Sequence, residues 1–261
     1  IPLIHLAPER ARAQILLHAA HQYIEGDACK WWHRAPNGGT GLADRTHASD
    51  PHLWLPYVTI RYVRGSGDYA ILDEVETFLE ASPVPKDQEG EATVPLTSRD
   101  KDTLLGHCAR GIDWTLDRFG AHGLPLMGSG DWDDGMNLLG DEGRGESVWL
   151  GFFLHGILLD MAPLFEAKGD AERAERYRER AVKLRSALEN CWRGDRYIRA
   201  YADDGEEVAP MSAMTSSWPT LARAVDAARG REAIENALAV LGLGDRVLLV
   251  HPPFDEHSQP Y

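Results

Sequence analysis

The sequence is organised as successive helical segments separated by helix-ending and helix-starting residues, and this constrains its fold most. From Ala174 to Trp192, apolar residues recur every three or four positions, which marks one face of an amphipathic helix. A Gly-Asp step interrupts the helical segments at 67–68 and again at 169–170. Glycine ends a helix in the left-handed conformation, and aspartate caps the free N–H groups of the next. The sequence therefore predicts helical hairpins, which must stack on one another to bury their apolar faces.

The helices that we expect are of two kinds. Residues 51–64 and 147–168 are apolar almost all round, as in interior helices, whereas 69–81 and 171–190 are amphipathic, as in outer ones. This alternation favours a double-layered (α/α) ring over an open solenoid. Other helices are expected at 8–24, 105–119, 211–228 and 231–241, with a third hairpin break at 228–231 and short strands at 196–201 and 246–250.

Four long segments rich in Gly, Pro, Asp and Asn connect these helices. Loops of such length inside a compact domain are usually functional, and in a ring of helix pairs they would gather at one rim. We therefore expect the functional site to be built from them. They cover residues 26–50, 82–100, 121–146 and 193–210.

Composition and charge narrow the functional classes. With 27 Lys and Arg against 41 Asp and Glu, the net charge of −14 disfavours nucleic acid and anionic membranes as partners and suits a neutral ligand such as a sugar. The three cysteines, Cys29, Cys108 and Cys191, have no short spacing, so we expect reduced, packed thiols. We predict a soluble piece of a longer protein, because no run of 18 apolar residues occurs and no methionine starts the chain.

The segment Asp131-Trp132-Asp133-Asp134 places three carboxylates around a tryptophan within a glycine-rich loop. An EF-hand-like calcium loop fits poorly, because Met136 occupies the position that requires glycine. A solvated turn remains an alternative. A sugar site fits better, since the C–H faces of sugars stack on indole rings and carboxylates bind their hydroxyls. Adjacent carboxylates also resist full ionisation, so one of them can keep a proton and act as a general acid.

A second candidate cluster lies on the loop that leads into the apolar segment 51–64. Asp44, Arg45 and Asp50 are candidate ligands there, because guanidinium groups bind anions and carboxylates bind hydroxyls. A salt bridge is an equally open role for Arg45. Asp50 before Pro51 also fits the start of a helix.

Glu146, in the segment GESVW, is the third candidate element. Its carboxylate could accept hydrogen bonds from sugar hydroxyls, or it could serve as the negative charge at the start of the helix that follows. No third ligand stands at metal-binding spacing near the histidines, so we expect no metal.

Four stretches resemble a known family. GSGDWDDGMNLLGDEGRGESVWLGFFL is similar to the signature of the inverting glycoside phosphorylases of glycoside hydrolase family 94, which includes cellobiose and chitobiose phosphorylases. DACKWW, RTHASDPHLWLPYVTIRYVRGSGD and VLLVHPPFD are closer to the phosphorylase-like C-terminal region of bacterial cyclic β-1,2-glucan synthases. The resemblance runs in order over almost the whole chain.

This resemblance implies an all-α (α/α)6 barrel, with residues 1–261 as one catalytic domain that is incomplete at its C-terminus. By resemblance, Asp134 is the general acid and Trp132 the sugar-stacking residue. Asp44 or Asp50, with Arg45, would bind the sugar next to the cleaved bond. Asp131 and Glu146 are further candidate ligands, and we also expect Asp131 and Asp133 to shape the loop and tune the proton of Asp134. Asp133 replaces the family's asparagine, a change that could raise the pKa of Asp134.

The activity implied is cleavage of a β-linked glucan, with β-1,2 linkages expected, by inorganic phosphate as co-substrate and without any cofactor. Inversion would give α-glucose 1-phosphate. An inverting hydrolase with Asp133 or Glu146 as base, and a non-catalytic glucan-binding module, are the alternatives. Implied partners are the glucan and the remaining domains of a longer parent, with a homodimer left open. The implied location is the cytoplasmic side of an inner-membrane synthase. The family's phosphate-binding segment, with its histidine, would follow Tyr261.

Overall fold

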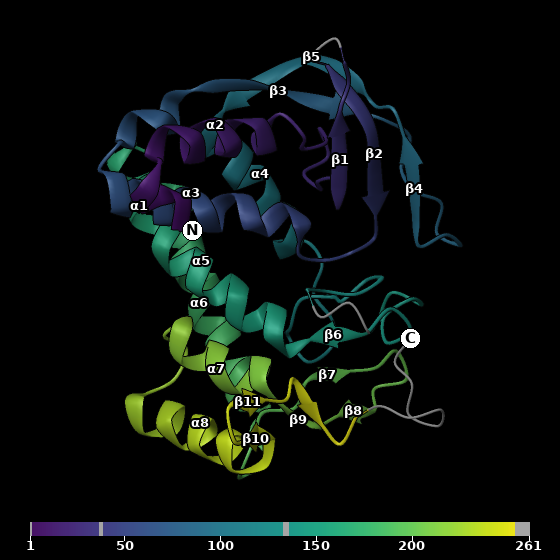
Figure 1. Ribbon diagram of the computed structural model, residues 1–261, viewed down its shortest axis with the longest axis vertical. Helices are drawn as coiled ribbons and strands as arrows, with labels where there is room; N and C mark the ends of the chain where they lie inside the picture. The colour runs from purple at the N-terminus through teal and green to yellow at the C-terminus, as the bar shows by residue number, and fades with distance from the viewer. Residues whose placement is uncertain (1, 37–38, 133–135, 254–261) are drawn as a thin grey trace. The chain divides into compact units, whose positions relative to one another are not determined.

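The computed structural model describes residues 2–36, 39–132 and 136–253 (Figure 1). The chain divides into two compact units, Ile1–Asp117 and Arg118–Tyr261. Each unit is described below by itself. The expectation of one catalytic domain over residues 1–261 stays a prediction.

The first unit contains three longer helices, α2 (Pro8–Ala19), α3 (Trp54–Ser66) and α4 (Leu104–Leu116). Helix α3 ends as predicted, because Gly67 adopts a left-handed conformation (φ 74°) and donates its N–H to the carbonyl of Val63. The shorter elements are α1 (Pro2–Leu6) and two 3₁₀ helices, η1 (Pro51–Leu53) and η2 (Tyr69–Asp73).

This unit also contains strands, which the all-α prediction did not include. Strands β1 (Trp31–Arg34), β2 (Thr40–Thr46) and β4 (Gly90–Thr93) form one antiparallel sheet, in the order β1-β2-β4, and β3 (Val75–Glu80) pairs with β5 (Leu96–Thr103). The pairing is visible in Figure 1.

The predicted helix over residues 69–81 is therefore wrong. Only its first turn is helical, as η2, and the rest is β3, whose residues Phe78 and Leu79 are fully buried. Branched and aromatic side chains in VETFLE suit a strand, and pairing with β5 outweighs the helical spacing.

The second unit is built on the helix pair that the sequence predicts most strongly. Helix α5 (Val148–Ala167) packs along α6 (Ala171–Glu189), as Figure 1 shows. The Gly-Asp step works as predicted, since Gly169 has φ 88° and the Asp170 carboxylate accepts from the N–H of Arg173 at 3.0 Å. By length and composition α5 could cross a membrane, but 72% of its apolar window is buried within the protein, which fits an interior helix.

The next helix pair begins and ends at residues other than those predicted. Helix α7 (Ala213–Leu221) stops early, and α8 (Ala227–Leu241) runs through the expected break at 228–231. Asp226 caps α8, while Gly230 lies inside it and is buried against α7. A Cβ atom at Gly230 would approach the Thr220 hydroxyl to 2.4 Å, so this glycine permits close packing and does not end a helix.

Short strands complete the second unit. Strands β6, β7 and β8 pair in that order, β9 pairs with β12, and β10 with β11, so the strands expected at 196–201 and 246–250 are present in part. All three cysteines are buried free thiols, which confirms the sequence prediction. The bounds are β6 (Glu146–Ser147), β7 (Ala200–Tyr201), β8 (Glu207–Val208), β9 (Met211–Ser212), β10 (Gly242–Leu243), β11 (Arg246–Val247) and β12 (Val250–His251).

The burial of His18 on α2 predicts acid sensitivity of the first unit. Burial, reinforced by the neighbouring His21, lowers the pKa of His18 to about 4, against a hydrogen bond with the Pro51 backbone. The unfolded chain, where the pKa is near 6.5, therefore binds more protons between pH 6.5 and 4. Stability should fall by about 3 kcal/mol as pH drops through this window.

Thermal melts from pH 7.5 to 4 measure this effect. His18→Gln should flatten the pH dependence, while the same change at the exposed His5 on α1 should leave it as in the wild type. An unchanged slope in His18→Gln would contradict the assignment.

Candidate functional site

Trp132 forms an exposed aromatic surface in the second unit. Its side chain is 53% exposed, and its ring stacks on Trp149 with centroids 5.9 Å apart and planes at 28°. Trp149 is fully buried and stacks in turn on Phe153 at 5.3 Å, with Trp218 at its edge. The interior aromatic side chains of α5 thus fix the orientation of an indole that solvent can reach, which is the property a sugar-stacking residue needs.

Asp131 lies beneath this loop and is buried. One carboxylate oxygen pairs with the guanidinium of Arg199 at 2.5 Å, and the other accepts from the hydroxyl of Ser147 at 2.5 Å. The same Ser147 oxygen accepts from the N–H of Leu150 and caps α5. Asp131 therefore anchors the Trp132 loop to the start of α5. The structure does not present its carboxylate to a ligand, contrary to the binding role expected from the resemblance.

The predicted general acid, Asp134, lies outside the described residues, together with Asp133 and Gly135. The described part of the loop ends at Trp132 and resumes at Met136, which is 1% exposed. Asp134 as the acid stays a prediction.

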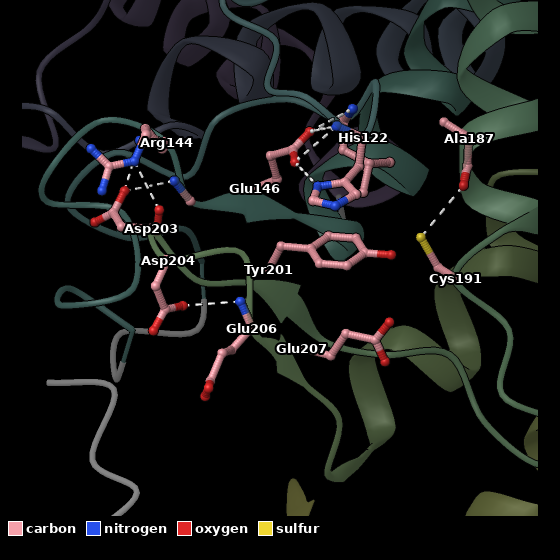
Figure 2. Close-up of polar contacts among 12 residues, drawn as sticks. His122, Arg144, Glu146, Ala187, Cys191, Tyr201, Asp203, Asp204, Glu206 and Glu207 are labelled. Atoms are coloured by element: carbon pink, nitrogen blue, oxygen red, sulfur yellow. Dashed lines mark hydrogen bonds and ion pairs between the residues drawn. The ribbon is translucent and has the colours of Figure 1, made fainter.

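Glu146 is buried, and its carboxylate is fully engaged (Figure 2). It accepts from the His122 ring through Nδ1 at 2.5 Å, from the His122 backbone N–H at 3.2 Å and from the Leu124 N–H at 3.0 Å. The His122 ring lies flat on Tyr201, with centroids 3.7 Å apart and planes at 5°. Glu146 therefore holds in place the segment that precedes the Trp132 loop. This differs from both roles considered from the sequence, a sugar ligand and the negative charge at the start of a helix.

A pocket of about 370 Å³ opens beside this pair, within the second unit. Three segments of the chain line it, and all lining residues except Phe119 and Gly120 fall in loops expected from the sequence. Its lining residues are Phe119, Gly120, Ala121, His122, Leu126, Gly143, Arg144, Glu146, Ala202, Asp203, Asp204 and Gly205.

Asp203 holds two of these segments together. Its carboxylate accepts from the backbone N–H groups of Glu142, Arg144 and Gly145 at 2.7–2.8 Å, and the Arg144 side chain donates to its carbonyl. Burial alone would raise the pKa of Asp203, but these three hydrogen bonds outweigh it and lower the pKa. These hydrogen bonds thus hold two segments of the pocket wall together.

In the first unit, Arg45 is buried in a bidentate ion pair. Its Nε and Nη2 atoms donate to the two Asp27 oxygens at 2.7 and 2.8 Å, Nη2 also reaches Glu25, and Nη1 donates to two backbone carbonyls. The guanidinium lies 4.1 Å from the Tyr23 ring centroid. In the structure, Arg45 therefore forms a salt bridge, one of the two roles that the sequence left open. Each N–H group of its guanidinium is bonded to the protein.

Asp44 and Asp50 differ in accessibility. Asp44 is half-buried on β2, opposite the partly exposed Trp31 of β1, and burial raises its pKa against the charge of Lys30 and a hydrogen bond from Trp31. Asp50 precedes η1 as predicted, but it is buried and accepts from the indole N–H of Trp54 at 2.6 Å. Of the three candidates in this unit, Asp44 alone is partly exposed, and its role as a sugar ligand stays a prediction.

The sequence belongs to the Glycosyl hydrolase 94 superfamily, whose catalytic-domain model matches residues 1–261. A cyclic beta-(1,2)-glucan synthase, NdvB of Rhizobium meliloti (strain 1021), is 36% identical over 98% of this chain. A solabiose phosphorylase of Paenibacillus borealis is 27% identical over 96%. The chain spans only 9% of the length of the first relative and 30% of the second.

Among solved structures, a rhamnosidase from Klebsiella oxytoca with rhamnose bound shares the fold. Its TM-score is 0.63 at 19% sequence identity, covering 92% of this chain and 40% of that one. Together with the family, this likeness supports a helical, barrel-like fold. The all-α part of the prediction is not confirmed, because the described residues include two sheets in the first unit.

Proposed function

We propose that this domain cleaves β-linked glucans with inorganic phosphate, with inversion at the anomeric carbon. The observation that carries the proposal is the exposed Trp132, supported from below by buried Trp149, directly before the Asp133-Asp134 pair in a family 94 domain. Phosphorylases among its relatives support the same reaction class. The relation to a cyclic β-1,2-glucan synthase favours β-1,2 linkages and a role in making or processing that glucan.

In the proposed mechanism, the sugar ring next to the cleaved bond stacks on Trp132 and Asp134 donates its proton to the glycosidic oxygen. A phosphate oxygen attacks the anomeric carbon from the opposite face while the glycosidic C–O bond breaks. The products are α-glucose 1-phosphate and a glucan one residue shorter. In the second unit, the side chain proposed to stack on the sugar is Trp132. In the first unit, Asp44 on β2 stays a proposed sugar ligand by resemblance, and Arg45 and Asp50 are proposed to hold the structure around it.

The burial of Glu146 supports phosphorolysis over hydrolysis. An inverting hydrolase needs a second carboxylate, about 6.5–9.5 Å from the acid, to activate water. Glu146 is 1% exposed and accepts from three N–H groups, so it is poorly placed to take a proton from water. A phosphorylase needs no such base, because phosphate is itself the nucleophile.

We further propose that the domain acts as part of a longer, membrane-associated synthase, on the cytoplasmic side, where phosphate is available. Inorganic phosphate is then the co-substrate and no cofactor takes part. Other domains of the parent chain, and a second copy in a homodimer, are the proposed protein partners.

Linkage specificity tests the proposal directly. The protein at its full natural length should release glucose 1-phosphate from β-1,2-glucan in phosphate buffer at least about tenfold faster than from β-1,3- or β-1,4-glucans. Equal rates on all three would contradict the β-1,2 assignment, and no release from any would contradict phosphorolysis.

Trp132→Ala should raise KM for the glucan by about tenfold or more, because it removes the stacking surface without touching the acid. Initial rates over a range of glucan concentrations measure this. Tyr69→Ala, which removes an aromatic side chain that is 54% exposed in the other unit, serves as a matched control and should have a smaller effect. Unchanged KM in Trp132→Ala would contradict its role.

A further inference from the structure

We propose that the pocket beside His122 and Glu146 is an additional saccharide subsite, which takes one glucosyl residue of the glucan chain. This rests on the proposed function for the identity of the sugar. The chain brings 119–126, 143–146 and 202–205 together around a volume of about 370 Å³. That volume lies within the range of about 300–1,000 Å³ typical of small-molecule sites.

The position of the pocket separates it from the Trp132 loop. Successive side chains of a strand point to opposite faces. On β6, Ser147 binds Asp131 beneath the Trp132 loop, whereas the neighbouring Glu146 binds His122 at the pocket. One short strand, β6, thus contributes a residue to each place, and both places lie within the second unit.

The polar groups of the pocket are arranged to meet hydroxyls. Glu146 fixes the His122 ring through Nδ1, and Tyr201 covers one ring face, yet the side chain of His122 is 41% exposed. Asp204 is an exposed lining residue, and one of its carboxylate oxygens accepts from the Glu206 N–H at 2.9 Å (Figure 2).

The balance of charge and apolar surface selects a neutral, polyhydroxylated ligand. Three carboxylates, those of Glu146, Asp203 and Asp204, outnumber the single guanidinium of Arg144, which already donates to Asp203 and Glu142. An anion such as phosphate would therefore be repelled. Phe119, Leu126 and two alanines supply the apolar wall that the C–H face of a sugar ring requires.

Filling the pocket tests the proposal. The probe is a β-1,2-linked glucopentaose, titrated calorimetrically in phosphate-free buffer into the protein at its full natural length. Ala121→Trp inserts an indole at an exposed lining position and should weaken binding about tenfold. Val182→Trp adds the same side chain at a position that is 69% exposed on α6, outside the pocket, and should bind as the wild type does.

A second pair of matched variants tests the subsite even if Ala121→Trp fails to fold. Asp204→Asn keeps the oxygen that accepts from the Glu206 N–H but removes the charge, and should weaken binding about threefold or more. Glu206→Gln neutralises an exposed carboxylate on the same turn that does not line the pocket, and should change nothing. Wild-type affinity in a folded Ala121→Trp or in Asp204→Asn overturns the subsite.

The outcome separates the subsite from the proposed function. If the protein turns over β-1,2-glucan with phosphate but Ala121→Trp binds normally, the subsite alone is wrong. If no turnover occurs but the lining variants still weaken binding, the subsite stands and the phosphorylase assignment fails. Absence of any pentaose binding to the wild type would overturn the subsite as well.

Discussion

Replacing Asp134 by asparagine should lower the rate of phosphorolysis by about 10²–10⁴-fold, with little change in glucan binding. Asparagine has nearly the same shape but no proton to give to the leaving oxygen, and general acid catalysis accounts for effects of this size. Steady-state release of glucose 1-phosphate, with binding measured separately by calorimetry, distinguishes the loss of chemistry from a loss of affinity.

The neighbouring Asp133 provides the control for this experiment. Asp133→Asn removes an equal charge one residue away and restores the residue that the resembling family carries there. We expect activity within about tenfold of the wild type and a pH profile whose alkaline limb shifts to lower pH, because losing a like charge lowers the pKa of Asp134. Wild-type rates in Asp134→Asn, or an equal loss in both variants, would contradict the assignment of the acid.

Asp131→Asn should destabilise the second unit by about 3–5 kcal/mol, because it removes the charged carboxylate that pairs with the buried guanidinium of Arg199. Both side chains of this pair are fully buried, so solvent cannot compensate. The Trp132 loop is anchored through the same carboxylate to Ser147 and α5. Chemical denaturation monitored by tryptophan fluorescence gives the change in the free energy of unfolding.

Two comparisons make this result specific. Glu142→Gln breaks an exposed ion pair with Arg144 in the same region and should cost less than about 1 kcal/mol. The double change Asp131→Leu with Arg199→Met removes both charges and should recover much of the stability, as apolar replacements of buried pairs often do. If Asp131→Asn denatures as the wild type does, the pair is not the anchor described.

The interior and outer helices of the second unit could be predicted because their signals are local. The apolar run of 148–167 and the period of 174–192 each lie within one segment, and the residues Gly169 and Asp170 that separate them act through their own backbone and side chain. Gly230 also lies at a predicted break between helices, but it is a glycine for a different reason, which is the close approach of its backbone to Thr220. Only the packed structure distinguishes the two.

The strands of the first unit could not be predicted from local pattern, because their pairing is not local. Strand β5, LTSRDKDT, shows no alternation of apolar residues, and it forms a strand because β3 pairs with it in register from Val75–Thr103 to Glu80–Leu96. Strand β2 likewise joins partners from residues 31–34 and 90–93.

At the candidate site, the sequence predicts the Trp132 loop as functional but does not show how that loop is held. Trp132 among carboxylates was recognisable, whereas its support, Trp149 on α5, looked like ordinary core. Arg199, His122 and Asp203 were missed, because each acts on a residue between 24 and 68 positions away, and no spacing in the sequence marks such pairs. Arg45 carried the chemistry of an anion ligand, but burial against Asp27 gives it a structural role.

The most direct test of the phosphorylase assignment is the product formed from β-1,2-glucan in matched buffers with and without phosphate. Proton and phosphorus NMR, followed during turnover by the protein at its full natural length, identify the product and its anomeric configuration. The account predicts α-glucose 1-phosphate as the first product in phosphate and no cleavage without it. Release of free glucose at the same rate in phosphate-free buffer would contradict it.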